Sequence, residues 1–184
     1  MEEFSIDLFS DNLIHFISEF KIEKAHVFGY SMGGFVALDA AYQFPANIDK
    51  IVTLGTKFEW SPRISVQEIR QLNPELIEDK VPRFPARLAE LHPANDWKEN
   101  MEMTADLMVE LGEQNGFDND LLEEINHDVT IGWGTEDRMV FKAESEFVAN
   151  HLTNGRFYSL SNQPHPIEKV DLDVLVNYIR STLL

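Results

Sequence analysis

Hydrophobic and polar residues follow two different periods along the chain. Apolar residues recur at helical spacing from about Ile6 to Phe20, which predicts an amphipathic helix. Short, mostly apolar runs typical of parallel strands occur at four places, residues 25–28, 50–55, 129–133 and 156–160. Further helical patterns follow these runs, over residues 32–43, 141–152 and 170–184. This alternation predicts an α/β fold with a doubly wound, mostly parallel sheet.

The pattern changes between residues 58 and 127, where prolines divide the chain into short pieces. Asn73 followed by Pro74 is typical of a helix N-cap with proline at the first helical position. The pattern from Asn95 to Leu111 predicts a longer helix that stops at Gly112. We therefore expect a core formed by residues 1–57 and 128–184, interrupted by a helical insertion over residues 58–127.

A serine flanked by small residues lies between the first predicted strand and the next helix. The stretch Gly29-Tyr30-Ser31-Met32-Gly33-Gly34 matches the pattern G-x-S-x-G, in which a strand turns sharply into a helix with the serine at the apex. Small neighbours at both i−2 and i+2 are expected to keep helix and strand from colliding. The turn exposes the Ser31 hydroxyl and directs the first N–H groups of the helix toward whatever it attacks.

An acidic residue and then a histidine follow Ser31 along the chain, each after a predicted strand. Asp137 comes after the predicted strand 129–133, and His165 comes after the predicted strand 156–160, within Gln163-Pro164-His165-Pro166. A serine hydroxyl needs a base to remove its proton, and a carboxylate can hold the imidazole of that base in the right tautomer. Glu136 is the neighbouring alternative to Asp137. The other histidines, His15, His26, His92, His127 and His151, are interpreted as structural or solvated.

The order Ser31, Asp137, His165 resembles that of the α/β-hydrolase superfamily, in its lid-bearing serine esterase, lipase and acyltransferase branch. The resemblance runs from about residue 6 to the C-terminus. It implies that Ser31, Asp137 and His165 are catalytic, that the Met32 N–H binds the oxyanion, and that the insertion is a cap, or lid. Residues expected to contact an acyl substrate are Tyr30, Trp60, Trp97 and Met101. Thioesterase, acyltransferase, lactonase and C–C bond hydrolase activities stay open within the fold, and no cofactor is implied.

Composition narrows the classes of partner. The 184 residues carry a formal net charge of −17, so the surface repels nucleic acid and anionic lipid. No apolar run reaches the about 18 residues of a membrane span, and no secretory leader is recognised, so we expect a cytoplasmic protein without membrane contact. The chain has no cysteine, which excludes thiol catalysis and thiolate metal sites. Histidine and carboxylate spacings predict no metal site.

Proteins of this superfamily usually carry several more strands before the helix that precedes the serine, and a loop among them supplies a second oxyanion donor. Three explanations for their absence stay open: a shortened gene product, a fragment of a longer protein, or an inactive relative that serves as a binding protein. An unpaired strand edge favours pairing with another strand. We therefore expect a homodimer joined antiparallel at residues 25–28, unless residues 1–5 or the first helix cover that edge.

Overall fold

The computed structural model describes residues 3–80, 83–91, 93 and 96–183. The chain divides into two compact units. One unit consists of Met1–Ser5 with Glu59–Gly116, and the other of Ile6–Phe58 with Phe117–Leu184. The segment 117–127, which was included in the predicted insertion, groups with the second unit.

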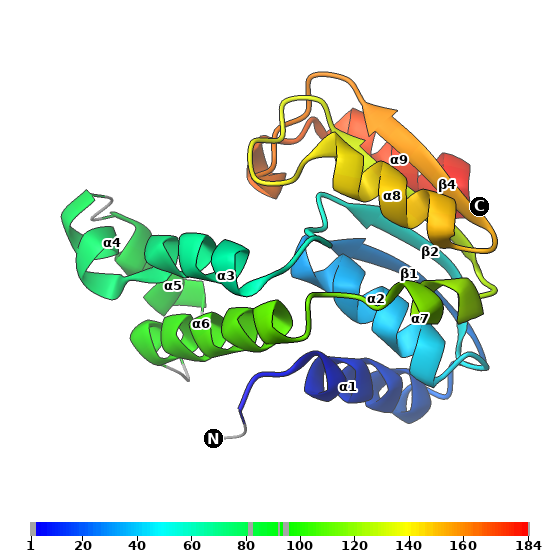
Figure 1. Cartoon of the computed structure of the whole chain (residues 1–184), viewed down its shortest axis with the longest axis horizontal. Helices are drawn as coiled ribbons and strands as arrows, with labels where there is room; N and C mark the ends of the chain where they lie inside the picture. The colour runs from blue at the N-terminus through cyan, green and yellow to red at the C-terminus, as the bar shows by residue number, and fades with distance from the viewer. Residues whose placement is uncertain (1–2, 81–82, 92, 94–95, 184) are drawn as a thin grey trace. The chain divides into compact units, whose positions relative to one another are not determined.

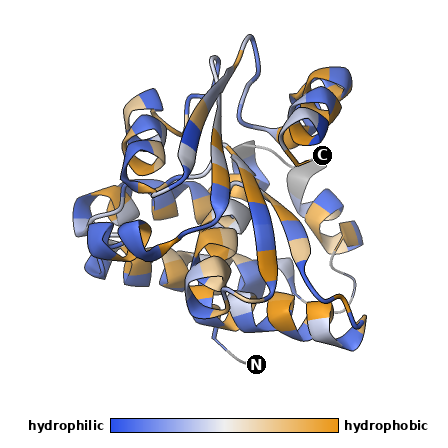
Figure 2. Cartoon of the chain, turned by 90° about the vertical axis from the view of Figure 1, so that its right-hand side faces the viewer, coloured by the Kyte–Doolittle hydropathy of each residue, from blue (hydrophilic) through white to orange (hydrophobic). Residues whose placement is uncertain are grey.

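The second unit contains a four-stranded sheet in the order β1-β2-β3-β4, with every neighbouring pair parallel. The strands are β1 (Ala25–Tyr30), β2 (Ile48–Leu54), β3 (Asp128–Gly134) and β4 (Gly155–Leu160). Figure 2 shows hydrophobic stretches along the strands, and the central strands β2 and β3 are mostly buried, as expected for strands covered on both faces. The predicted α/β fold with a doubly wound parallel sheet is therefore confirmed.

Helices cover both faces of this sheet. They are α1 (Ile6–Glu19), α2 (Met32–Gln43), α7 (Asn119–Glu124), α8 (Lys142–His151) and α9 (Leu172–Leu183). Figure 1 shows α2 and α8 over one face and α9 over the other. Side-chain alternation along β2 agrees with this arrangement. Thr53 lies against Gly34 of α2, whereas Val52 and Leu54 belong to a buried cluster that includes side chains of α9.

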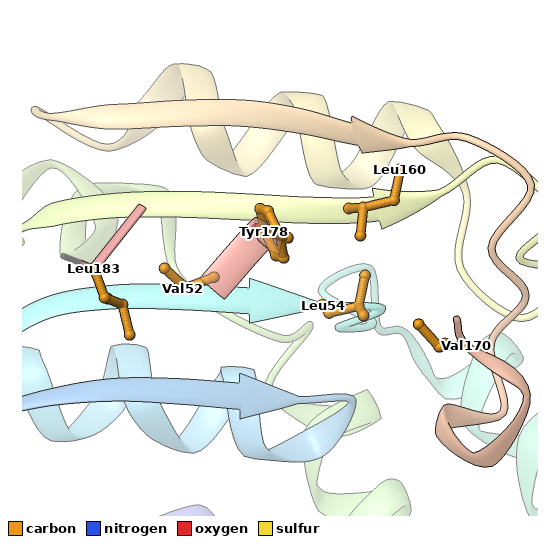
Figure 3. Packing of buried hydrophobic residues seen from close by; sticks show 6 residues of the cluster. All are labelled: Val52, Leu54, Leu160, Val170, Tyr178 and Leu183. Atoms are coloured by element: carbon orange, nitrogen blue, oxygen red, sulfur yellow. The ribbon is translucent and has the colours of Figure 1, made fainter. Parts of the chain in front are cut away.

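A buried cluster fixes α9 on the sheet. It contains Val52, Leu54, Leu160, Val170, Tyr178 and Leu183, which lie over the strands in Figure 3. The Tyr178 hydroxyl donates a hydrogen bond of 2.9 Å to the main-chain oxygen of Thr53. Burial raises the pKa of Tyr178 well above its ordinary value, so the phenol stays protonated and remains a donor.

The first unit is helical, with α3 (Pro62–Ile69), α4 (Pro74–Lys80), α5 (Arg83–Leu91) and α6 (Trp97–Glu113). The predicted N-cap of α4 is confirmed, because Asn73 Oδ1 accepts from the Leu76 N–H at 3.0 Å. The predicted stop of α6 at Gly112 is wrong, since the helix continues through it to Glu113. Gly112 instead permits close packing of α3 on α6, because a Cβ there would overlap the Ser65 side chain.

Strand β1 lies at the edge of the sheet and, among the described residues, pairs only with β2. Its apolar side chains Val27 and Phe28 are only half-buried, whereas Ile51 and Val52 of β2 are fully buried. Phe16 and Phe20, near the end of α1, are exposed and contact each other. A strand with an open edge and partly exposed apolar side chains is a template for pairing with another strand.

The homodimer at residues 25–28 stays a prediction. Light scattering coupled to size exclusion is expected to give twice the chain mass at micromolar concentration, because pairing β1 with its copy satisfies the open edge. Hydrogen exchange on dilution should then deprotect the amides of residues 25–28. A monomer, or a dimer without protection of this strand, would contradict the prediction.

Candidate active site

Ser31 occupies the turn between β1, which ends at Tyr30, and α2, which begins at Met32. Its backbone has φ of 52° and ψ of −123°, an unusual conformation for a residue other than glycine. The Ser31 N–H donates to the Leu54 main-chain oxygen at 2.9 Å, which ties the turn to β2. Its side chain makes no capping hydrogen bond to α2, so the hydroxyl is available for other partners.

Glycines allow β1 and α2 to approach each other closely. A Cβ at Gly29 would lie 2.4 Å from the Gly33 main-chain oxygen, and one at Gly34 would overlap the Thr56 side chain. A Cβ at Gly33 would meet nothing within 4 Å. The expected steric need for a small residue at i+2 is therefore wrong. The tight contacts fall at Gly29 and Gly34, because Gly34 rather than Gly33 faces β2 and the residues after it.

Asp137 lies in the turn that follows β3, with its carboxylate held by the main chain. Its Oδ1 accepts from the N–H groups of Met139 at 2.8 Å and of Val140 at 2.9 Å. The Trp133 indole N–H donates to the Val140 oxygen at 3.0 Å and closes the turn over the strand end. These bonds leave Oδ2 free to face the loop after β4.

The structure brings the three predicted residues together within one unit. Ser31 Oγ lies 3.3 Å from His165 Nε2, and His165 Nδ1 lies 2.8 Å from Asp137 Oδ2. A carboxylate can only accept, so Nδ1 carries the ring proton and Nε2 offers its lone pair to Ser31. The distance of 3.3 Å is long for a hydroxyl donor, and such contacts tighten in reactive complexes.

The electrostatics of Asp137 suit its place in this arrangement. The side chain is 2% exposed, and that of His165 is 10% exposed. Burial alone raises the pKa of the Asp137 carboxyl, but hydrogen bonds from the His165 ring and from the Val140 and Met139 N–H groups outweigh it. The net result is a pKa below the ordinary value. Asp137 is therefore ionised at neutral pH and accepts the hydrogen bond from His165 Nδ1.

The loop that carries His165 is tied down by a residue that sequence reasoning missed. Gln163 is buried, and its side chain donates to the Ser161 oxygen at 2.9 Å and accepts from the Asp171 N–H at 2.8 Å. Its main-chain oxygen accepts from the Glu136 N–H at 3.0 Å, which joins this loop to the acid turn. Its position directly before Pro164 and His165 belongs to no motif that would mark it as an anchor.

A second missed residue, Gly55, lies directly against the histidine–aspartate pair. Its φ is +63°, and its N–H donates to the Gly132 oxygen at 3.1 Å. A Cβ at this position would lie 3.2 Å from both Asp137 Oδ2 and His165 Nδ1. Such a contact is tighter than side chains normally tolerate, so glycine leaves the room that the His165–Asp137 hydrogen bond occupies.

Gly55→Ala is expected to lower kcat on an ester substrate by about 10- to 100-fold, because His165 and Asp137 are the predicted catalytic pair and small displacements of such groups are costly. The matched control is Gly116→Ala, which places alanine at a φ of +76° in the helical unit. Both variants carry the backbone cost of a positive φ, but only the first crowds His165. Equal kcat values for the two variants, measured beside their thermal stabilities, would refute this role.

The remaining predicted residues lie in different settings. Met32 is the first residue of α2, so its N–H is not used by the helix, and the residue is 41% exposed. The Tyr30 hydroxyl bonds to the main chain of His165. Trp60 and Trp97 are buried and Met101 is half-buried, all in the helical unit, and their assignment to substrate stays a prediction.

The alternatives at the acid and base positions do not enter the arrangement. The carboxylate that contacts His165 belongs to Asp137, whereas Glu136 contributes its main-chain N–H. His26 lies beside Asp49, and the rings of His127 and His151 contact the main-chain oxygens of Pro45 and Phe147. His92 lies outside the described residues.

Within residues 3–80, 83–91, 93 and 96–183, no group of three or more histidine or acidic side chains is placed to hold a metal ion. No helix in that part of the chain is long and apolar enough to cross a membrane.

Solved structures with the same fold include several enzymes. The 2-hydroxy-6-oxo-6-phenylhexa-2,4-dienoate hydrolase of a Rhodococcus species matches with a TM-score of 0.75 and 21% identity over 97% of this chain and 70% of that one. A Thermogutta terrifontis esterase matches with 0.72 and 17% over 99% and 72%. The Burkholderia xenovorans enol-lactonase matches with 0.70 and 18% over 96% and 74%.

At these identities the likeness establishes the fold. A comparison with curated proteins finds no significant match. A family model described as the alpha/beta hydrolase fold matches residues 3–104, more than half of the 184-residue chain and including the Ser31 turn. The resemblance deduced from the three motifs is therefore confirmed, and the chain belongs to the α/β-hydrolase fold family.

Proposed function

We propose that the chain is a serine hydrolase that cleaves an ester or a related acyl substrate. The observation that supports this most strongly is the continuous line of contacts from Ser31 Oγ through His165 to Asp137. A hydroxyl, an imidazole and a buried carboxylate in this order form the arrangement that activates serine toward acyl carbonyls. All three residues belong to the unit that contains the sheet.

In the first half of the proposed reaction, Ser31 Oγ attacks the acyl carbon while His165 Nε2 takes the hydroxyl proton. The carbonyl π electrons move to oxygen, and the Met32 N–H donates to that oxyanion. Asp137 stabilises the resulting imidazolium through Nδ1–H. The tetrahedral intermediate then collapses, the bond to the leaving oxygen breaks, and His165 returns the proton to the alcohol.

In the second half, water replaces the alcohol. His165 Nε2 removes a proton from water as the water oxygen attacks the acyl carbon of the ester on Ser31. Collapse of the second tetrahedral intermediate breaks the bond to Ser31 Oγ, and His165 protonates that oxygen. The products are a carboxylic acid and the free serine, so the cycle needs no cofactor in the proposed reaction.

The chemistry and the names of similar structures support the choice of an ester or related acyl substrate. An esterase and an enol-lactonase are among them, and a lactone is a cyclic ester. These names support ester cleavage by water over transfer of the acyl group to another acceptor.

A series of p-nitrophenyl esters with increasing acyl length tests the proposal. Saturable release of p-nitrophenol above the buffer rate, with a preferred chain length, would support a serine hydrolase and identify the size of its acyl group. Release no faster than in buffer across the whole series, from a folded protein, would instead support a binding protein derived from a hydrolase.

A further inference from the structure

Tyr30 connects the strand that carries the nucleophile to the loop that carries the base. It is the last residue of β1 and directly precedes Ser31. Its hydroxyl donates a hydrogen bond of 2.8 Å to the main-chain oxygen of His165, a residue 135 positions further along the chain. The side chain therefore reaches from the strand end to the histidine itself, not to a distant part of its loop.

Two further contacts join Tyr30 to the same segment. The rings of Tyr30 and His165 lie 5.5 Å apart between centroids with a tilt of 44°. Burial raises the pKa of Tyr30, and a hydrogen bond with the Ile167 main chain partly offsets this rise. The phenol is therefore protonated at neutral pH and can donate to His165 while it interacts with Ile167.

The segment around His165 needs anchors of this kind. Pro164 and Pro166 flank the histidine and have no N–H to donate, so the chain there forms few main-chain bonds of its own. Gln163 secures the segment upstream, and the Lys169 N–H binds the Pro166 oxygen at 2.9 Å downstream. Tyr30 adds a hydrogen bond at His165 itself, from a different strand.

We propose that Tyr30 is a positioning residue that sets the separation of the nucleophile and the base. Because Tyr30 and Ser31 are consecutive, a bond from Tyr30 to the His165 main chain fixes the base relative to the nucleophile through one peptide unit. Ser31 Oγ and His165 Nε2 are 3.3 Å apart, so a small outward movement of the loop would place them beyond hydrogen-bond reach. The effect of the Ser31–His165 separation on turnover rests on the proposed function.

Tyr30→Phe tests the inference, because it keeps the ring beside His165 and removes only the hydroxyl. We expect kcat on the preferred ester to fall about tenfold with KM unchanged, since a neutral hydrogen bond and the geometry it holds are lost. The matched control is Tyr178→Phe, which removes another tyrosine hydroxyl bonded to a main-chain oxygen, at 2.9 Å from Thr53. That variant should lose stability and keep its kcat.

A proton NMR measurement tests the positioning role of Tyr30 independently of any activity assay. The Nδ1 proton of a histidine bonded to a carboxylate gives a far-downfield proton NMR resonance. This resonance is expected in wild type and in Tyr178→Phe, and it should broaden or vanish in Tyr30→Phe as the loop loosens. If Ser31→Ala hydrolyses esters as fast as wild type, the proposed function fails, and the resonance still decides the role of Tyr30.

Two results would overturn the inference. The first is a Tyr30→Phe protein with wild-type kcat and an unchanged downfield resonance. The second is a raised KM with an unchanged resonance, which would make Tyr30 a substrate contact as the sequence pattern predicted.

Discussion

Ser31→Ala is expected to lower kcat for ester hydrolysis by at least about 10³-fold, to the rate of the buffer. The expectation follows from geometry. Ser31 Oγ is the proposed nucleophile and faces His165 Nε2 at 3.3 Å, and alanine offers no atom that can form the acyl intermediate. Folding should change little, because the side chain makes no capping bond to α2.

The comparison variant is Ser18→Ala, which removes an exposed hydroxyl near the end of α1. Both proteins are to be assayed on the same ester, with circular dichroism to verify their folding. The Ser18 variant should hydrolyse the ester at the wild-type rate. A folded Ser31→Ala protein that does the same would show that hydrolysis occurs elsewhere or by another route.

Asp137→Asn is expected to lower kcat by about 10²–10⁴-fold, the range typical of losing a carboxylate that orients a catalytic histidine. An amide at this position can donate a hydrogen bond to Nδ1. The ring proton would then lie on Nε2, and Nε2 could not accept the proton of the Ser31 hydroxyl. The loss should appear in kcat, because Asp137 is 2% exposed and contacts His165 through Oδ2 at 2.8 Å.

Glu136→Gln is the matched control for Asp137→Asn. It makes the same carboxylate-to-amide change one residue earlier, at an exposed residue whose main-chain N–H is bonded to Gln163. We expect a kcat within about twofold of wild type, as for surface changes away from a site. A large loss in Glu136→Gln with little loss in Asp137→Asn would reverse the assignment of the acid.

Features that depend on neighbouring residues in the chain were predictable from the sequence. The period of apolar residues located the four strands, and the G-x-S-x-G pattern placed Ser31 between β1 and α2. Ser31, Asp137 and His165 each follow the end of a strand. Their proximity was predictable because parallel strands present their carboxyl ends at one edge of a sheet.

Features that depend on distances across the fold were not predictable. Gly112 was interpreted as a helix stop by its residue type, but its role is set by Ser65 on another helix. Gly55 and Gln163 carry no motif, and only the packed structure shows that one faces the His165–Asp137 pair and the other secures its loop. Tyr30 was expected to contact substrate. Its hydrogen bond to His165 depends on where the loop after β4 lies, which the sequence does not specify.

Reaction with a fluorophosphonate tests the central claim most directly, because the reagent bonds covalently to a serine whose proton can be removed by a base. Mass spectrometry of the digested protein is expected to find one adduct, on Ser31, formed more slowly in His165→Ala and Asp137→Asn. An unlabelled Ser31 in the folded wild-type protein, or equal labelling of it in His165→Ala, would contradict the account.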